Sequence, residues 1–323
     1  MPTKTKSKTL KFTPHDLIQQ IEGYEQLKAK GLTVNSLTKA SVLAKKKIDR
    51  FLPKKLKSVL VIEVPAETEA VIKFTNPIFS LKINLCFVVG ARAKVTIFDN
   101  QQPAQDASNE GGVYAIADKD SLVDYLIVNS KQPNTQMFYA AYPSQGTKFN
   151  WYLVGKLNGE KHDITVVINH LLDKSWGTIT SAIDFGKNSK SIVKLINNHQ
   201  SKGSQGDIVF KGLGKDNARA RIDGLIEIGK KAIDTNSYLQ EDVLLVSPGS
   251  NIDAQPNLEI LNNEVKASHG ATLGSVDPKV LFYLMSRGLS ASQAEKLIIG
   301  GFLGNITRDI ENELVAEQFK NSL

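Results

Sequence analysis

Cysteine is almost absent from this sequence, since Cys86 is the only one in 323 residues. A single thiol excludes an intrachain disulfide and any zinc or iron site made of several thiolates from this chain. Cys86 lies within the apolar segment LKINLCFVVG. We therefore expect its thiol to be buried and unreactive.

Long apolar runs are missing as well. No segment reaches the roughly 18 to 20 apolar residues that a membrane-spanning helix requires. The amino terminus is polar and basic with no apolar run behind it, unlike a secretory signal. We therefore expect a cytoplasmic protein that does not have a membrane as a partner.

Positive charge is in excess, with 40 Lys and Arg against 33 Asp and Glu, but the excess is local. Much of it lies in the amino-terminal tail and in the stretch 45–57. That stretch could bind nucleic acid, although Phe51 is its only aromatic side chain on which bases could stack. We expect solvated charge there and no nucleic-acid partner, and a nucleic-acid-binding protein remains an alternative.

Familiar catalytic motifs are also lacking, so we expect no enzyme. GLGKDNAR at 212–219 lacks the hydroxyl residue that follows the lysine of a phosphate-binding loop. His162 and His170 would lie roughly 26 Å apart on one strand, too far to share a metal ion. Four aspartates could pair as the carboxylates of a β-helix carbohydrate-active enzyme, an alternative that their spacing does not require. They are Asp99, Asp163, Asp184 and Asp223.

The residues that are present divide the chain into three zones: a tail and helical region at 1–55, a β-rich core at 56–276 and a helical region at 277–323. Helical spacing predicts a helix that begins near Thr13 or Asp16 and stops near Gly31. The core contains many short runs rich in Val, Ile, Phe and Tyr, separated by turn residues. No amphipathic helix interrupts these runs, which leaves a sandwich, a barrel or a β-helix, and mildly favours the last.

The third zone shows clear helix signals. Asp277 is a good N-cap with Pro278 behind it, and Ser290 with Gln293 forms a capping box for a second helix. A final helix is predicted near the carboxy terminus by an apolar periodicity. Its residues are Ile310, Leu314, Val315 and Phe319.

Segments near the carboxy terminus form a specific pattern. They are PNLEI at 256–260, EVKASHGATLG at 264–274 and LFYLMSRGL at 281–289, followed by Ala294. Their order and spacing resemble the signature of the SufB/SufD family, the scaffold proteins of the Suf iron–sulfur cluster assembly machinery. The upstream segments DIVFKG and ARARIDGLIEI resemble the core repeats of that family, and SHGAT is typical of its SufD-like members.

The resemblance implies a mainly β fold, a right-handed parallel β-helix core flanked by short N-terminal and C-terminal helical regions. It implies a non-catalytic scaffold subunit that pairs with a SufB-type subunit, or with a second copy of itself. A SufC-type ABC ATPase would bind the C-terminal helices at 277–323. No cofactor would be tightly bound by this chain alone, and a transient iron–sulfur cluster would be shared with the partner subunit.

His269 is the residue that the resemblance assigns to the cluster. The matching histidine of SufD-like proteins lies at the subunit interface, so His269 is expected there as a cluster or metal ligand. Ala267 replaces a cysteine that the family often carries two residues earlier, which leaves no thiol of this chain beside His269. A structural histidine bonded to a nearby carbonyl is the alternative.

The segment FYLMSRG has two interpretations. Phe282, Tyr283 and Arg287 are residue types enriched at protein interfaces, and the resemblance assigns them to binding of the ATPase partner. The other apolar residues of this helix are expected to pack as ordinary core against the end of the β-helix. They are Leu281, Leu284 and Met285.

Overall fold

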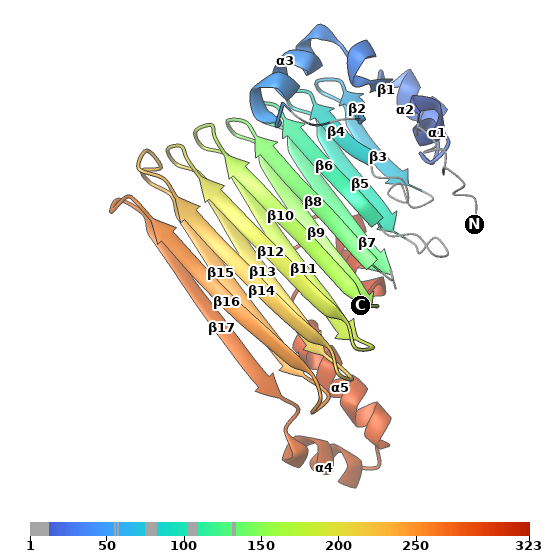
Figure 1. The fold of residues 1–323 in the computed structure, drawn as a ribbon, viewed down its shortest axis with the longest axis vertical. Helices are drawn as coiled ribbons and strands as arrows, with labels where there is room; N and C mark the ends of the chain where they lie inside the picture. The colour runs from blue at the N-terminus through green and yellow to red at the C-terminus, as the bar shows by residue number, and fades with distance from the viewer. Residues whose placement is uncertain (1–12, 55, 57, 75–82, 102–108, 131–133) are drawn as a thin grey trace, which may run out of the picture.

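The computed structural model describes residues 13–54, 56, 58–74, 83–101, 109–130 and 134–323 (Figure 1). They form a parallel β-solenoid of about 7 turns with short helices at both ends, as predicted. Each turn contributes two strands. The basic tail at 1–12, and Lys55 and Lys57 of the basic stretch, lie outside the described residues.

The strands collect in two sheets that face each other. The even sheet has the order β1-β2-β4-β6-β8-β10-β12-β14-β16, and the odd sheet has the order β17-β15-β13-β11-β9-β7-β5-β3. Neighbours are parallel except β1 and β2. The strands are β1 (Thr33–Ser36), β2 (Val59–Val64), β3 (Glu69–Phe74), β4 (Ile83–Val89), β5 (Lys94–Gln101), β6 (Asn109–Ala117), β7 (Leu122–Ser130), β8 (Asn134–Pro143), β9 (Lys148–Asn158), β10 (Lys161–His170), β11 (Trp176–Gly186), β12 (Lys190–His199), β13 (Gln205–Gly214), β14 (Arg219–Ile228), β15 (Asn236–Leu245), β16 (Asn251–Ile260) and β17 (Lys266–Ser275).

Alternation of side chains along each strand creates the core. In β12, buried and less buried residues alternate from Lys190 to His199, because successive side chains point to opposite faces of the sheet. The parallel register places similar side chains of successive turns above one another, as in the column Ile164, Val193 and Ile222. One continuous apolar core therefore fills the space between the two sheets, and each buried aliphatic or aromatic side chain contributes about 1.5–3 kcal/mol.

A column of corners with positive φ aligns the turns of the solenoid. Its backbone N–H groups bond to the next turn, as from Asp120 to the carbonyl of Gln145 (3.1 Å) and from Lys174 to that of Lys202 (2.9 Å). A serine or threonine follows most corners, and several of these hydroxyls bond a carbonyl three residues back. The corners are Glu67, Arg92, Asp120, Gly146, Lys174, Gly203 and Asp234.

Short helices and β1 close the amino-terminal end of the solenoid. They are α1 (Pro14–Ile18), α2 (Tyr24–Ala29), the 3₁₀ turn η1 (Leu37–Lys39) and α3 (Val42–Phe51). The apolar side chains of Leu17, Ile21 and Leu27 join the main core and cover its first turn. The predicted N-cap Thr13 is confirmed by a capping box with Asp16.

The prediction of one helix across this region is wrong. The chain leaves helical geometry after α1 because Ile21 forms a β-bridge with Phe74, the last residue of β3. Gly23 then adopts a left-handed conformation (φ 63°) and starts α2. Contact with the sheet thus overrides the helical periodicity of the sequence.

The carboxy-terminal helices run from the open end back along the outer face of the odd sheet (Figure 1). They are α4 (Pro278–Ser286), α5 (Ala291–Leu303) and α6 (Glu313–Asn321), and their predicted caps at Asp277 and Ser290 are confirmed. Leu303, Val315 and Phe319 pack on Leu126 and Tyr152 of the sheet, among others. No helix in the described ranges has the length and apolar character needed to cross a bilayer.

Candidate functional site

The carboxy-terminal end of the solenoid is open. In the described part of the chain, β16 pairs only with β14 and β17 only with β15, so each sheet ends in an unpaired strand edge (Figure 1). Exposed apolar residues surround this end: Ile260, Leu261 and Leu273. Unpaired edges and clustered exposed apolar side chains are features of surfaces that bind another protein.

His269 lies in the middle of this open end. It pairs in register with Leu239, which is fully buried, so the two side chains belong to the same inward-facing column. His269 is nevertheless exposed, because no further turn covers β17. No hydrogen bond holds its imidazole among the residues described, which argues against a structural histidine bonded to a nearby carbonyl.

Small residues flank His269, as the sequence suggested. Ala267 and Ala271 occupy the neighbouring inward positions, in register with Ser237 and Glu241. Gly270 points outward, where a Cβ would stand 2.6 Å from the side-chain oxygen of Gln240. The imidazole is therefore the largest polar group presented by the inward face of β17, and the space around it is open to a partner.

Sequence reasoning missed Glu241, which lies one turn below His269. It pairs in register with Ala271 and is fully buried. The backbone N–H of Gly224 lies near its carboxylate, but no hydrogen bond of normal geometry reaches either oxygen from the described residues. Burial raises the pKa of this carboxyl to about 7. The signal was present, because Glu241 is a charged residue at an inward position of an alternating strand between Leu239 and Val243.

The helix α4 leaves the open end with its apolar side chains uncovered. Phe282 is 72% exposed and Tyr283 is 55% exposed, and the guanidinium carbon of Arg287 lies over the Tyr283 ring, 5.2 Å from its centroid. The expectation that the other apolar residues of α4 form core is wrong, since no residue of this helix is buried. Leu281 and Leu284 are half-buried and Met285 is exposed, because α4 extends beyond the last turn of the solenoid.

The remaining histidine and cysteine candidates are structural. His162 and His170 are buried at opposite ends of β10, as their spacing predicted. His170 stacks on His199 with ring centroids 4.4 Å apart, and each Nδ1 lies within hydrogen-bonding distance of a serine hydroxyl. Cys86 is fully buried, and burial raises the pKa of its thiol, as expected for an unreactive residue.

The four aspartates considered for carbohydrate chemistry do not converge. Asp99 points into the core and accepts a bond from Tyr125, whereas Asp184 pairs with Lys215 on the odd sheet. Asp163 and Asp223 lie on strands of the even sheet that are separated by β12. The described residues also contain no group of three or more His, Cys, Asp or Glu that could hold a metal ion.

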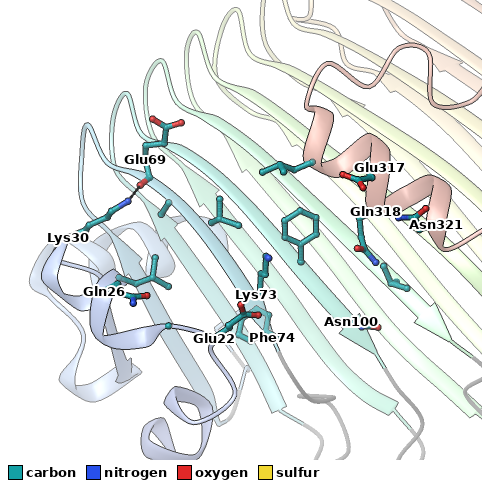
Figure 2. A pocket seen from close by; sticks show the side chains of 17 residues that line it. Glu22, Gln26, Lys30, Glu69, Lys73, Phe74, Asn100, Glu317, Gln318 and Asn321 are labelled. Carbon is teal, nitrogen blue, oxygen red and sulfur yellow. Dashed lines mark hydrogen bonds between the residues drawn. The ribbon is translucent and has the colours of Figure 1, made fainter.

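A groove at the opposite end of the molecule was not predicted. It has a volume of about 850 Å³ and lies between α2, α6 and the outer face of β3 and β5 (Figure 2). Its charges are mixed, with Glu22, Glu69 and Glu317 against Lys30 and Lys73. The Lys30 ammonium already donates to the carbonyl of Glu69. No set of like charges or reactive groups converges among the described residues of this groove.

The basic stretch is partly engaged within the fold. Lys47 forms an ion pair with Asp118 (2.8 Å), Lys45 donates to the carbonyl of Thr38, and Arg50 lies over the Phe51 ring. The Lys47–Asp118 pair holds α3 on the solenoid, whereas the other two contacts lie within α3 or between α3 and the preceding 3₁₀ turn. The described part of the stretch therefore offers fewer free cations than the sequence suggests.

The molecule is a parallel solenoid whose open end carries an exposed histidine, and comparison of sequences identifies the family to which it belongs. Residues 72–302 match the family model described as "SUF system FeS cluster assembly, SufBD core domain". The match spans more than half of the chain, so the chain belongs to the SufBD core family.

Individual relatives make the chain SufD-like. It is 34% identical over 173 residues to the iron–sulfur cluster assembly protein SufD of Bacillus subtilis, covering 53% of this chain and 39% of the relative. It is 36% identical over 110 residues to SufD of Escherichia coli, covering 34% and 26%. A SufBD family protein of Synechocystis is 27% identical over 252 residues, covering 76% and 47%. The matched regions thus span less than half the length of each of these relatives.

Proposed function

We propose that this chain is a non-catalytic scaffold subunit of a cytoplasmic Suf iron–sulfur cluster assembly complex. The observation that carries the proposal is the open end, where two unpaired strand edges surround an exposed, inward-column histidine. A partner solenoid can extend both sheets there by strand addition. The nascent cluster, which is the cargo of the complex, would form between the two chains at His269.

The chemistry of the chain favours a SufB-type partner over a second copy of itself. Iron–sulfur clusters are held mainly by cysteine thiolates, with histidine as an occasional ligand. The only thiol of this chain, Cys86, is fully buried in another part of the solenoid. A second copy would therefore add an imidazole but no thiolate, whereas a cysteine-bearing SufB-type subunit supplies what the site lacks.

The test is replacement of His269 by alanine in the reconstituted complex. Because the side chain is exposed and unbonded, folding and pairing should change little. Cluster formation should fall sharply, since one iron loses a ligand. Ser268→Ala, an adjacent exposed position that points outward, is the matched control and should leave cluster yield unchanged.

Absorbance of the reconstituted cluster and the thermal transition of the chain together decide the outcome. A His269→Ala variant that pairs and builds clusters like the Ser268→Ala control would overturn the ligand role. Loss of the fold together with normal cluster yield from the folded remainder would show that His269 is structural.

The uncovered helix α4 is the proposed docking element for a SufC-type ATPase. Phe282 and Tyr283 provide exposed aromatic surface, and Arg287 lies over the Tyr283 ring. Aromatic and arginine side chains are the types that most often dominate binding energy at interfaces. The helix also follows directly after β17, so ATPase movements would reach the cluster site through a short connection.

Replacement of Phe282 and Tyr283 by serine should weaken ATPase binding at least tenfold without lowering stability, because neither side chain is buried. Leu314→Ser is the control, since Leu314 is 55% exposed on α6, away from α4. Affinity would be measured by titration calorimetry with the purified ATPase. Equal affinities for the double variant and the control would place the docking surface elsewhere.

A further inference from the structure

Glu241 is a charged side chain whose burial the scaffold role does not yet explain. It points into the solenoid from β15 and is fully buried. The backbone N–H of Gly224 lies near its carboxylate and lowers its pKa, but no hydrogen bond of normal geometry reaches either oxygen from the described residues. An unpaired buried carboxylate is costly unless a cation or hydrogen-bond donor accompanies it. Glu241 lies one turn below the open end, so a cation that enters at this end would meet its carboxylate.

The carboxylate occupies space left by a glycine across the core. A Cβ at Gly224 would overlap the carboxylate of Glu241 and would stand 2.8 Å from Cδ1 of Leu239. Gly224, Leu239 and Glu241 therefore lie in one layer of side chains across the core. A residue larger than glycine at 224 would displace the carboxylate.

The next layer of side chains belongs to β16 and β17 and forms the open end of the solenoid. In register, Leu239 is followed by His269, Glu241 by Ala271, and Gly224 by Pro256. Neighbouring strands are about 4.8 Å apart, so His269 and Glu241 lie in successive layers on adjacent inward columns. Ala271 and Pro256 are the residues of the last turn that lie in register above Glu241 and Gly224.

We propose that Glu241 and His269 together bind a divalent iron ion at the open end, as the half of a shared site that this chain supplies. The proposal rests on the proposed scaffold function and adds a second ligand to it. A carboxylate and an imidazole form a ligand set suited to ferrous iron, while the softer thiolates are left to the partner. Asp223 and Asp253, on the neighbouring strands β14 and β16, add negative potential around the site.

The test measures metal binding by the full-length chain alone. Co²⁺, a spectroscopic substitute for Fe²⁺, would be titrated into the protein, and anaerobic Fe²⁺ titration would repeat the measurement. Glu241→Gln and His269→Ala should each weaken Co²⁺ binding at least tenfold. Ala271→Leu should do the same, because it blocks the path between the two ligands and leaves both of them in place.

Glu259→Gln is the matched control, since Glu259 is an exposed carboxylate on the terminal strand β16. It should leave the affinity unchanged. Equal affinities for Glu241→Gln and Glu259→Gln would overturn the proposal, as would a wild-type chain that binds no Co²⁺ at millimolar concentration. If His269→Ala still abolished cluster formation in the complex, the scaffold function would stand without the second ligand.

Discussion

At the scale of single residues, Glu241 links stability to the open end. Burial raises its pKa to about 7, so the folded state holds the proton more tightly than the unfolded state. Its contribution to stability is therefore complete below about pH 4.5 and is lost as the pH rises through 7. The native protein is thus less stable at alkaline pH than its core alone would make it.

Glu241→Gln keeps the shape of the side chain and removes the charge. We expect it to raise the free energy of unfolding by up to about 3 kcal/mol at pH 8 and to have little effect at pH 4, because one pKa unit corresponds to about 1.36 kcal/mol. Urea unfolding at the two pH values would measure this. An equal effect at both would contradict a carboxyl that titrates in the folded state.

The residues of the site differ in how far the sequence could predict them. His269 was found because it lies inside a motif of specific spacing, and its exposure follows from being in the last strand. Glu241 belongs to no motif, and its burial depends on the space beside Gly224, which lies on another strand. A pattern along one strand shows which face a residue occupies, but only the register between strands shows what lies opposite.

At the scale of elements, the C-terminal helices differ in how much of their surface is buried. No residue of α4 is fully buried, whereas α6 buries Val315 and Phe319 against the odd sheet. The side-chain amide of Asn312, the N-cap of α6, also donates to Thr96 (2.9 Å) and Asp124 (2.9 Å). Removing the whole region 278–320 would uncover apolar residues of β7 and β9, so point variants of α4 are the better test of docking.

Phe319→Ala should lower the free energy of unfolding by about 3–5 kcal/mol, because it removes a fully buried aromatic side chain and leaves a cavity. Leu314→Ala on the same helix is the control and should change stability by less than about 0.5 kcal/mol, since that side chain is largely exposed. Thermal unfolding followed by circular dichroism would compare them. Similar losses for both variants would show that α6 does not pack on the sheet as described.

At the scale of the whole molecule, the sequence predicted the architecture but not the register. The change from helical periodicity to short β-rich runs marks the two ends of the solenoid. The regular feature that aligns the turns is the column of positive-φ corners, and its members range from Gly146 and Gly203 to Lys174 and Asp234. These residues share a positive φ but differ in residue type, so no strict sequence repeat is visible.

The closed amino-terminal end has a consequence for stoichiometry. A solenoid with two free ends is a bifunctional monomer, and it can add further units without limit to give a fibre. Among the described residues, α1 and α2 cover the core at one end and Ile21 bridges to β3, so the end that carries β16 and β17 is the one whose core is left uncovered. In the terms of polymer chemistry, a chain that pairs through this uncovered end alone would be monofunctional, and growth would stop once two molecules have met.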